Sequence, residues 1–251
     1  MLIRPNVLEL PRAVPIFTGM LRVFLIVFLA SVLSAAAVQK EYILLSGGPS
    51  LIEWEKYKAV PHDRWWGNFI RAARVRIEQI RKEQGPEAEI TWLVYKPGYV
   101  RRGARQDNAD LIGNIVSVRD KYHVNLVWIA NGDDVVNYLN AGRPRDQVKI
   151  ANFEFFGHSN RACWMFDYSN EIDSGSKSWL HEGELCKLRR GLFTRDALIK
   201  SWSCHTGESM SKFWRQATGK RLIGAIGKTD YADGHLRGWT PALSAGARWG
   251  G

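Results

Sequence analysis

The chain has 251 residues, enough for one domain of ordinary size with a well-buried core. Its formal net charge is +10, but the basic residues are spread among acidic ones rather than gathered in a tract. No DNA-binding or RNA-binding motif is present, so nucleic acid is not expected as a partner in spite of the positive charge.

The first 37 residues have the features of a signal peptide. Basic residues, the last of them Arg22, precede a short apolar run at 23–33, and Ser-Ala-Ala-Ala follows at 34–37. This order of charged, apolar and small residues is typical of export signals. The uncharged stretch 23–38 is shorter than the roughly 20 residues of a membrane helix. We therefore expect cleavage after Ala37 and an exported protein, periplasmic or secreted, with a membrane anchor as the alternative.

Beyond the leader, strand-like and helix-like segments alternate along a single expected domain, 38–251. Compact apolar runs predict strands, and apolar residues at helical spacing predict helices. Expected strands cover 41–46, 89–95, 124–129, 148–156, 198–204 and 221–226; expected helices cover 65–82, 133–140, 210–217, a segment capped by Asn108, and a short approach at 193–197. An insertion at about 161–190 interrupts the pattern at the rim of the sheet, and the tail 238–251 is predicted to be loop. The alternation predicts an α/β three-layer sandwich with a mostly parallel sheet.

Two expected strands end in side chains that suit nucleophilic catalysis. The fourth strand runs into Gly157-His158-Ser159, and the fifth ends at Cys204. Parallel strands point the same way, so His158 and Cys204 are expected at one edge of the sheet, on strands about 5 Å apart if these are neighbours. An imidazole beside a thiol can take its proton and later protonate a leaving amine. Backbone N–H groups of Cys204, Gly157 and Ser159 are the expected oxyanion donors.

These strand ends resemble those of the caspase–legumain–gingipain clan of cysteine peptidases, in which one strand ends in His-Gly and a later one in Ala-Cys or a close variant. The counterparts here are Phe-Phe-Gly-His158-Ser and Trp-Ser-Cys204, 46 residues apart (204 minus 158), against roughly 50 in the caspase signature. Cys-His-Thr-Gly-Glu-Ser-Met at 204–210 is similar to the Cys-Glu-Ser-Gly-Ser-Met turn of the legumain branch. Ser159 departs from the clan's usual Gly after the histidine. The resemblance implies a caspase-hemoglobinase-like fold and an endopeptidase that acts on peptides or proteins without a cofactor.

Substrate-binding residues are expected in the loops that follow the strands. In the legumain branch an Arg-His pair after the first strand helps to form the primary pocket, and His62 and Arg64 lie in the comparable loop here in a different order. Asp230 and Asp233 follow the last expected strand and are candidates for binding a basic side chain. Trp202 stands where legumains carry a specificity carboxylate, so asparaginyl specificity is not expected.

Three cysteines lie beyond the leader, and an odd number leaves one thiol over in an oxidising compartment. A disulfide between Cys163 and Cys186 is expected to close the local insertion, which leaves Cys204 free. No pair of His and Cys residues has the close spacing of a structural zinc site, so no metal is expected.

Two alternatives stay open. Gly-His-Ser-Asn-Arg at 157–161 partly matches the Gly-x-Ser-x-Gly elbow of α/β-hydrolases, with Ser159 as nucleophile and His235 and an aspartate as partners. Arg161 replaces the last glycine, and a strand is expected next where an elbow needs a helix. Alternatively, the domain keeps the fold and binds a partner without catalysis, against which the intact His158 and Cys204 argue.

Overall fold

The computed structural model describes residues 38–50, 65–168 and 178–251. Residues Gln39–Gly251 form one compact unit, and the predicted signal peptide lies outside the described residues. None of the helices within the described ranges is long and apolar enough to cross a membrane.

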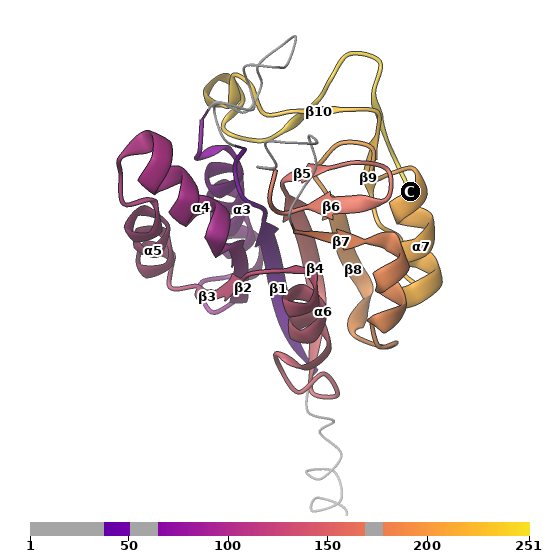
Figure 1. The fold of residues 1–251 in the computed structure, drawn as a ribbon. Coiled ribbons are helices and arrows are strands. Elements are labelled where there is room, and N and C mark those ends of the chain that lie inside the picture. Colours follow the sequence, from indigo (N-terminus) through magenta and orange to yellow (C-terminus); the bar gives the residue numbers. More distant parts are fainter. Residues whose placement is uncertain (1–37, 51–64, 169–177) are drawn as a thin grey trace, which may run out of the picture. The chain divides into compact units, whose positions relative to one another are not determined.

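Strands and helices alternate along most of this unit (Figure 1). The central sheet contains β1 (Gln39–Ser46), β2 (Glu89–Tyr95), β3 (Asn125–Ile129), β4 (Val148–Phe156) and β8 (Phe193–Ser201). The α-helices are α3 (Asn68–Gln84), α4 (Lys96–Arg102), α5 (Leu111–Tyr122), α6 (Gly132–Ala141) and α7 (Ser209–Thr218), and a π-helical turn, η1 (Gly103–Asp107), follows α4. The short elements are β5 (His158–Ser159), β6 (Cys163–Met165), β7 (Trp179–His181), η2 (Glu182–Lys187), β9 (Gly224–Ile226), β10 (Thr229–Asp230), η3 (Gly234–Arg237), β11 (Ala242–Leu243) and β12 (Arg248–Gly250).

The five central strands are all parallel and lie in the order β3-β2-β1-β4-β8. The chain adds β2 and β3 on one side of β1 and then returns to add β4 and β8 on the other side. The predicted α/β fold with a mostly parallel sheet is therefore confirmed. The change of direction between β1 and β4 is a topological switch point, and open α/β sheets bind ligands beyond the carboxyl ends of their strands at such a point.

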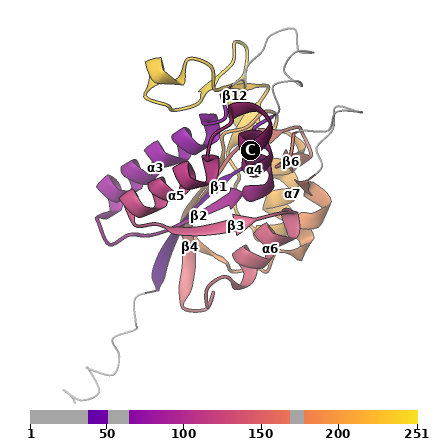
Figure 2. The ribbon, with the colours of Figure 1, turned by 60° about the vertical axis from the view of Figure 1, so that its left-hand side comes forward.

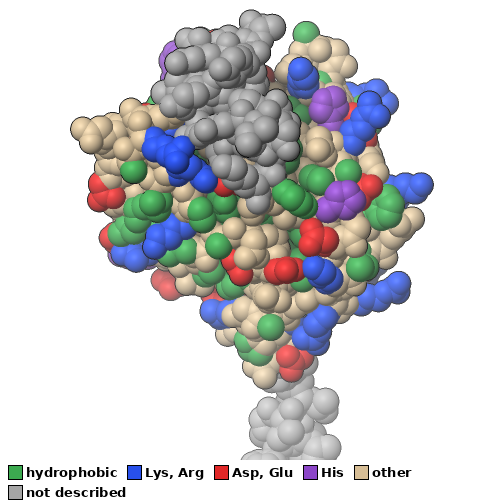
Figure 3. Space-filling model, in the orientation of Figure 1, with side chains coloured by type: hydrophobic (Ala, Val, Ile, Leu, Met, Phe, Trp, Pro, Cys, Tyr) green, Lys and Arg blue, Asp and Glu red, His purple; other side chains and the backbone are tan. Residues whose placement is uncertain are grey.

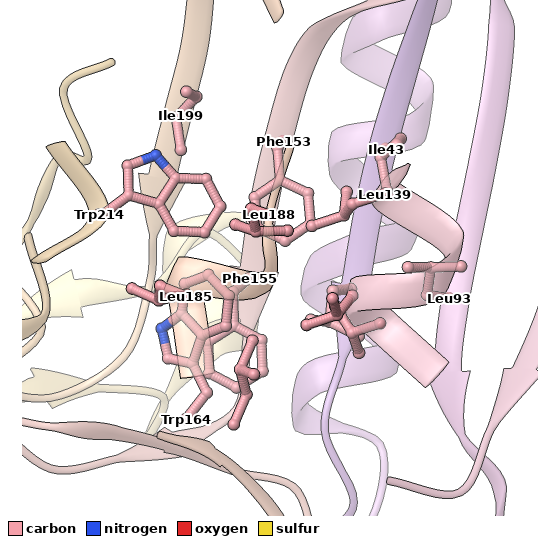
Figure 4. Packing of buried hydrophobic residues seen from close by; sticks show 14 of the residues in the cluster. Ile43, Leu93, Leu139, Phe153, Phe155, Trp164, Leu185, Leu188, Ile199 and Trp214 are labelled. Carbon is pink, nitrogen blue, oxygen red and sulfur yellow. The ribbon is translucent and has the colours of Figure 1, made fainter. Parts of the chain in front are cut away.

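Helices cover both faces of the sheet, α3 and α5 on one and α6 and α7 on the other (Figures 1 and 2). Alternate residues of β1 serve the two faces: Leu44 packs with α3 and α5, whereas Leu45 belongs to the cluster of α6 and α7. In that second cluster Trp214 of α7 stacks on Phe153 of β4 with ring centroids 5.6 Å apart (Figure 4). Strands buried on both faces are near-continuous apolar runs, which is why the sequence marked them clearly.

The segment 193–197, predicted as helical, is the first part of β8. Ile150 pairs with Phe193 and Asn152 with Leu198, so residues 194–197 bulge out of the ladder opposite a single residue of β4. Five residues are too few to show a helical or a strand period, and the pairing with β4 decided the outcome.

The expected strand at 221–226 joins the central sheet only through one parallel bridge, between Lys200 and Ile223. Its second half, β9, pairs instead with β12 from the tail that was predicted to be loop. The insertion at 161–190 contains β6 and β7, which form a small antiparallel sheet with the preceding β5, and then η2. The pairing of β9 with β12 and the bridge between Lys200 and Ile223 join residues far apart in sequence, so local patterns do not show them.

Two local features near α5 also differ from expectation. The segment after Tyr95 forms α4 and η1, which are not among the expected helices. The cap of α5 is Asp110, whose Oδ1 accepts from the Gly113 N–H at 2.8 Å, whereas Asn108 has a left-handed backbone at φ 44°.

Side chains of both charges are interspersed on the face seen in Figure 3, in keeping with the dispersed charge of the sequence.

Candidate active site

The ends of β4 and β8 meet at one edge of the sheet. From Asn152↔Leu198 to Phe155↔Ser201 the two strands keep a constant offset of 46 residues (201 minus 155). The Trp202 N–H continues this ladder by donating to the Phe155 carbonyl at 2.8 Å. His158 and Cys204 have the same offset, and each lies three residues beyond the last pair. The expectation that the two strands are parallel neighbours is confirmed, and both residues follow the carboxyl end of their strand.

Gly157 separates β4 from β5 and is packed too closely for a side chain. A Cβ at this position would lie 2.5 Å from the ring of Phe155. Beyond it, His158 and Ser159 turn into an antiparallel pairing with Met165 and Trp164 of β6. The small sheet therefore fixes the direction in which the chain leaves β4 at the position of the histidine.

The half-buried ring of His158 lies among aromatic side chains. Phe69, at the start of α3, meets it edge to face with centroids 5.0 Å apart, and the Tyr168 ring lies 4.8 Å away. Phe69 also packs edge to face on Tyr231, whose hydroxyl donates to the Trp202 carbonyl at 2.7 Å. These contacts restrict the orientation of the imidazole.

Cys204 lies in the turn between β8 and α7, and its sulfur faces β10. The Thr229 N–H donates to Sγ at 3.4 Å, and Thr229 Oγ1 lies 3.6 Å from the same atom. The Ser159 hydroxyl donates to the Cys204 carbonyl at 2.5 Å and so ties the two strand ends together. Gly207 holds the far side of the turn against β9, since a Cβ there would lie 2.4 Å from the Gly224 carbonyl oxygen.

A carboxylate stands beside this turn. Glu208 Oε1 lies 2.8 Å from His205 Nδ1, and Oε2 lies 2.9 Å from Arg161 Nε. The hydrogen bond with His205, assisted by the Gly227 N–H and Arg161, lowers the pKa of Glu208 from its usual value. His205 has a left-handed backbone at φ 62°, and the carboxylate of Glu208 pairs with its ring.

The residues predicted to bind substrate are only partly placed at the rim. His62 and Arg64 lie outside the described residues. Trp202 stacks on Phe156 and donates its indole N–H to Glu154 at 2.6 Å, which gives it a packing role on the α3 face of the sheet. Asp230 follows β9 as expected.

The carboxylate of Asp230 is already engaged. Oδ2 lies 3.3 Å from Arg237 Nη2, and Oδ1 accepts from the Ala232 N–H at 2.7 Å. Asp233 is exposed, with a left-handed backbone at φ 50° before η3. Neither carboxylate gives specific support for a basic substrate side chain.

The disulfide predicted between Cys163 and Cys186 is wrong, because all three cysteines are free. Cys163 is half-buried on β6 opposite His181 of β7, whereas Cys186 is exposed on η2, where its thiol donates to the Gly183 carbonyl at 3.2 Å. Sequence proximity suggested the pair, but η2 directs the second thiol elsewhere.

We expect Cys163 to react much more slowly than Cys186 with iodoacetamide at pH 8. Burial, with smaller contributions from Glu182 and Glu184, raises the pKa of Cys163 to about 11. The thiolate is the reactive form, so the Cys163 reaction should accelerate as the pH rises toward that value. Peptide mapping after timed alkylation measures both rates, and a Cys186→Ser variant confirms the assignment. Equal rates, or two unreactive thiols released together by reductant, would contradict this result.

The structure bears on two further hypotheses from the sequence, a serine-hydrolase elbow and a metal site. Ser159 is buried, gives its hydroxyl to Cys204 and is followed by β6, so the strand–turn–helix of a hydrolase elbow is absent at this described segment. Within ranges 38–50, 65–168 and 178–251, no three His, Cys, Asp or Glu side chains are grouped to hold a metal ion.

Four residues that the sequence did not single out contact the candidate residues or the turn that holds them: Thr229 contacts Cys204, Glu208 contacts the neighbouring His205, and Phe69 and Tyr168 contact His158. Glu208 is only four residues after Cys204, and a carboxylate so close to a candidate nucleophile was a usable signal. Phe69 and Thr229 come from distant elements and carry no local motif.

Comparisons of the chain with protein-family models, with curated proteins and with solved structures found no significant match.

Proposed function

We propose that this domain is a cysteine endopeptidase in which His158 and Cys204 form the catalytic dyad, as the clan resemblance implied. The observation that carries the proposal is the shared register of the two strand ends, which brings both residues to the rim beside the switch point. Export of the protein, as the leader sequence suggests, is part of the same proposal.

In this mechanism His158 takes the proton of the Cys204 thiol, and the thiolate attacks the carbonyl carbon of a peptide bond. Backbone N–H groups of Cys204, Gly157 and Ser159 stabilise the oxyanion that forms. The C–N bond then breaks as His158 protonates the leaving amine, which leaves a thioester on Cys204. Water, deprotonated by His158, attacks the thioester and releases the acid product with the free thiol.

The surroundings of the pair support these roles. Phe69 and Tyr168 restrict the imidazole, and the Thr229 N–H is directed at the sulfur. The Ser159 hydroxyl donates a hydrogen bond to the Cys204 carbonyl, so the role assigned to Ser159 is structural and not that of the nucleophile.

The test is the alkylation rate of Cys204 at pH 7 in the wild type and in His158→Ala, with exposed Cys186 as the reference in each sample. We expect Cys204 to react faster than Cys186 in the wild type, and His158→Ala to slow it by about tenfold or more, since only the thiolate is nucleophilic. An unchanged Cys204 rate in His158→Ala would overturn the dyad and leave the non-catalytic binding domain as the better account.

A further inference from the structure

Glu208 occupies the N-cap position of α7, yet its carboxylate makes no capping hydrogen bond to that helix. The first turn is closed by other groups: the Ser211 N–H donates to the Thr206 carbonyl at 3.1 Å, and the Ser211 hydroxyl donates to the Gly207 carbonyl at 3.0 Å. The side chains that usually cap at this position are the shorter Asp, Asn, Ser and Thr. The longer side chain of Glu208 instead reaches groups outside α7.

Three segments of the chain meet on this one carboxylate. Oε1 lies 2.8 Å from His205 Nδ1 and accepts from the Gly227 N–H at 3.3 Å, and Oε2 pairs with Arg161 Nε at 2.9 Å. An ionised carboxylate only accepts, so His205 Nδ1 carries the proton in this contact. Each oxygen therefore has at least one donor, and two of the three donors are side chains that carry or can carry positive charge.

Each of the three segments also holds a part of the dyad. Arg161 follows the His158-Ser159 strand and accepts the Met210 N–H on its carbonyl at 2.8 Å. His205 is bonded to Cys204 in sequence, and its N–H donates to the Gly227 carbonyl at 2.7 Å. Gly227 begins the turn that leads to Thr229, whose N–H reaches the sulfur of Cys204.

We propose that Glu208 is a positioning residue that joins the Arg161 segment after the catalytic histidine, the turn after Cys204 and the Gly227 turn, and so fixes the dyad without touching substrate. This inference rests on the proposed function for its catalytic meaning. The charge is needed as well as the shape: in Glu208→Gln one carboxylate oxygen becomes an NH₂ group, which faces either Arg161 or the His205 and Gly227 donors and loses that contact.

The test compares Glu208→Gln, Arg161→Ala and the double variant with a matched control, Arg143→Ala. The Arg143 guanidinium pairs with Glu89 at 2.6 Å at the start of β2, and both partners are well exposed. The readouts are the Cys204 alkylation rate relative to Cys186, hydrogen exchange at the His205 and Met210 amides, and the melting temperature.

We expect Glu208→Gln to lower the relative alkylation rate of Cys204 by about tenfold, the scale of a small misplacement in a catalytic site. Exchange at the His205 and Met210 amides should quicken, while the melting temperature changes no more than in Arg143→Ala. Arg161→Ala should act in the same direction, and the double variant should be no slower than Glu208→Gln alone because both remove one network.

An unchanged Cys204 rate and unchanged exchange in Glu208→Gln would overturn the positioning role, whatever the activity of the wild type. A fall in melting temperature with the relative Cys204 rate unchanged would also overturn it, because that pattern indicates a purely structural contact. If both readouts change as expected but the wild type cleaves no peptide, the positioning role stands and the peptidase function fails. If the wild type cleaves peptides and Glu208→Gln does so equally well, the peptidase function stands and the positioning role fails.

Discussion

Replacing Cys204 by alanine is expected to abolish peptide cleavage, because the variant has no atom that can form the thioester. His158→Ala should retain the nucleophile and lower kcat by about 10²- to 10⁴-fold, the usual contribution of a positioned acid–base group. The measurement is cleavage of a mixture of randomised peptides, followed by mass spectrometry, at equal concentrations of folded protein.

Two control variants distinguish Cys204 as the nucleophile from another thiol and from Ser159. Cys186→Ala changes an exposed thiol on η2 and should cleave like the wild type. Ser159→Ala removes one hydrogen bond to the Cys204 carbonyl and should cost about tenfold or less, in line with the net free energy of one such bond. Loss of all cleavage in Ser159→Ala with activity kept in Cys204→Ala would show a serine hydrolase instead.

A second large effect is expected far from the rim, at the amino end of the sheet. Arg145→Ala should lower the free energy of unfolding by about 3–5 kcal/mol, the usual loss when one partner of a buried ion pair is removed. The Arg145 Nη1 lies 2.5 Å from Glu41 Oε2, and both side chains are at most 2% exposed. The other oxygen of Glu41 accepts from the hydroxyls of Thr91 and Tyr138 at 2.6 and 2.7 Å. Removal of the guanidinium leaves this carboxylate buried without its counter-ion.

Urea unfolding of Arg145→Ala beside Arg143→Ala measures the effect. Arg143 also pairs with a glutamate of the sheet, but in an exposed place, so its loss should cost less than about 1 kcal/mol. The loss of unfolding free energy in the double variant Glu41→Ala/Arg145→Ala should be smaller than the sum of the losses in the two single variants. Neither charge is then left buried without its partner. Similar losses for Arg143→Ala and Arg145→Ala would show that burial does not set the energy of this pair.

The central sheet could be predicted from the sequence because its signal is local. β2 and β4 are apolar runs whose predicted bounds, 89–95 and 148–156, match the structure. The end of β4 before Gly157-His158 could be predicted for the same reason, whereas β8 ends at Ser201, three residues before the predicted end at Cys204. Parallel direction then placed both strand ends on one rim without knowledge of the strand order.

What the sequence did not reveal depends on contacts between distant segments. The pairing of β9 with β12 joins residues 224–226 to 248–250, and neither segment has enough residues for a recognisable period. The contact of Thr229 with Cys204 likewise joins residues 25 positions apart. The disulfide failed as a prediction because two cysteines near in sequence were placed on separate elements, β6 and η2.

The constant offset between β4 and β8 also determines where the chain can change in length. One residue added between Phe155 and His158, or between Ser201 and Cys204, would move one residue about 3.3 Å along the strand direction relative to the other. Residues added to the connection between β7 and β8 leave the ladder from Asn152↔Leu198 to Phe155↔Ser201 untouched. An added residue at either strand end would therefore change the placement of His158 relative to Cys204, whereas one added to the exposed turn at 189–191 would leave it unchanged.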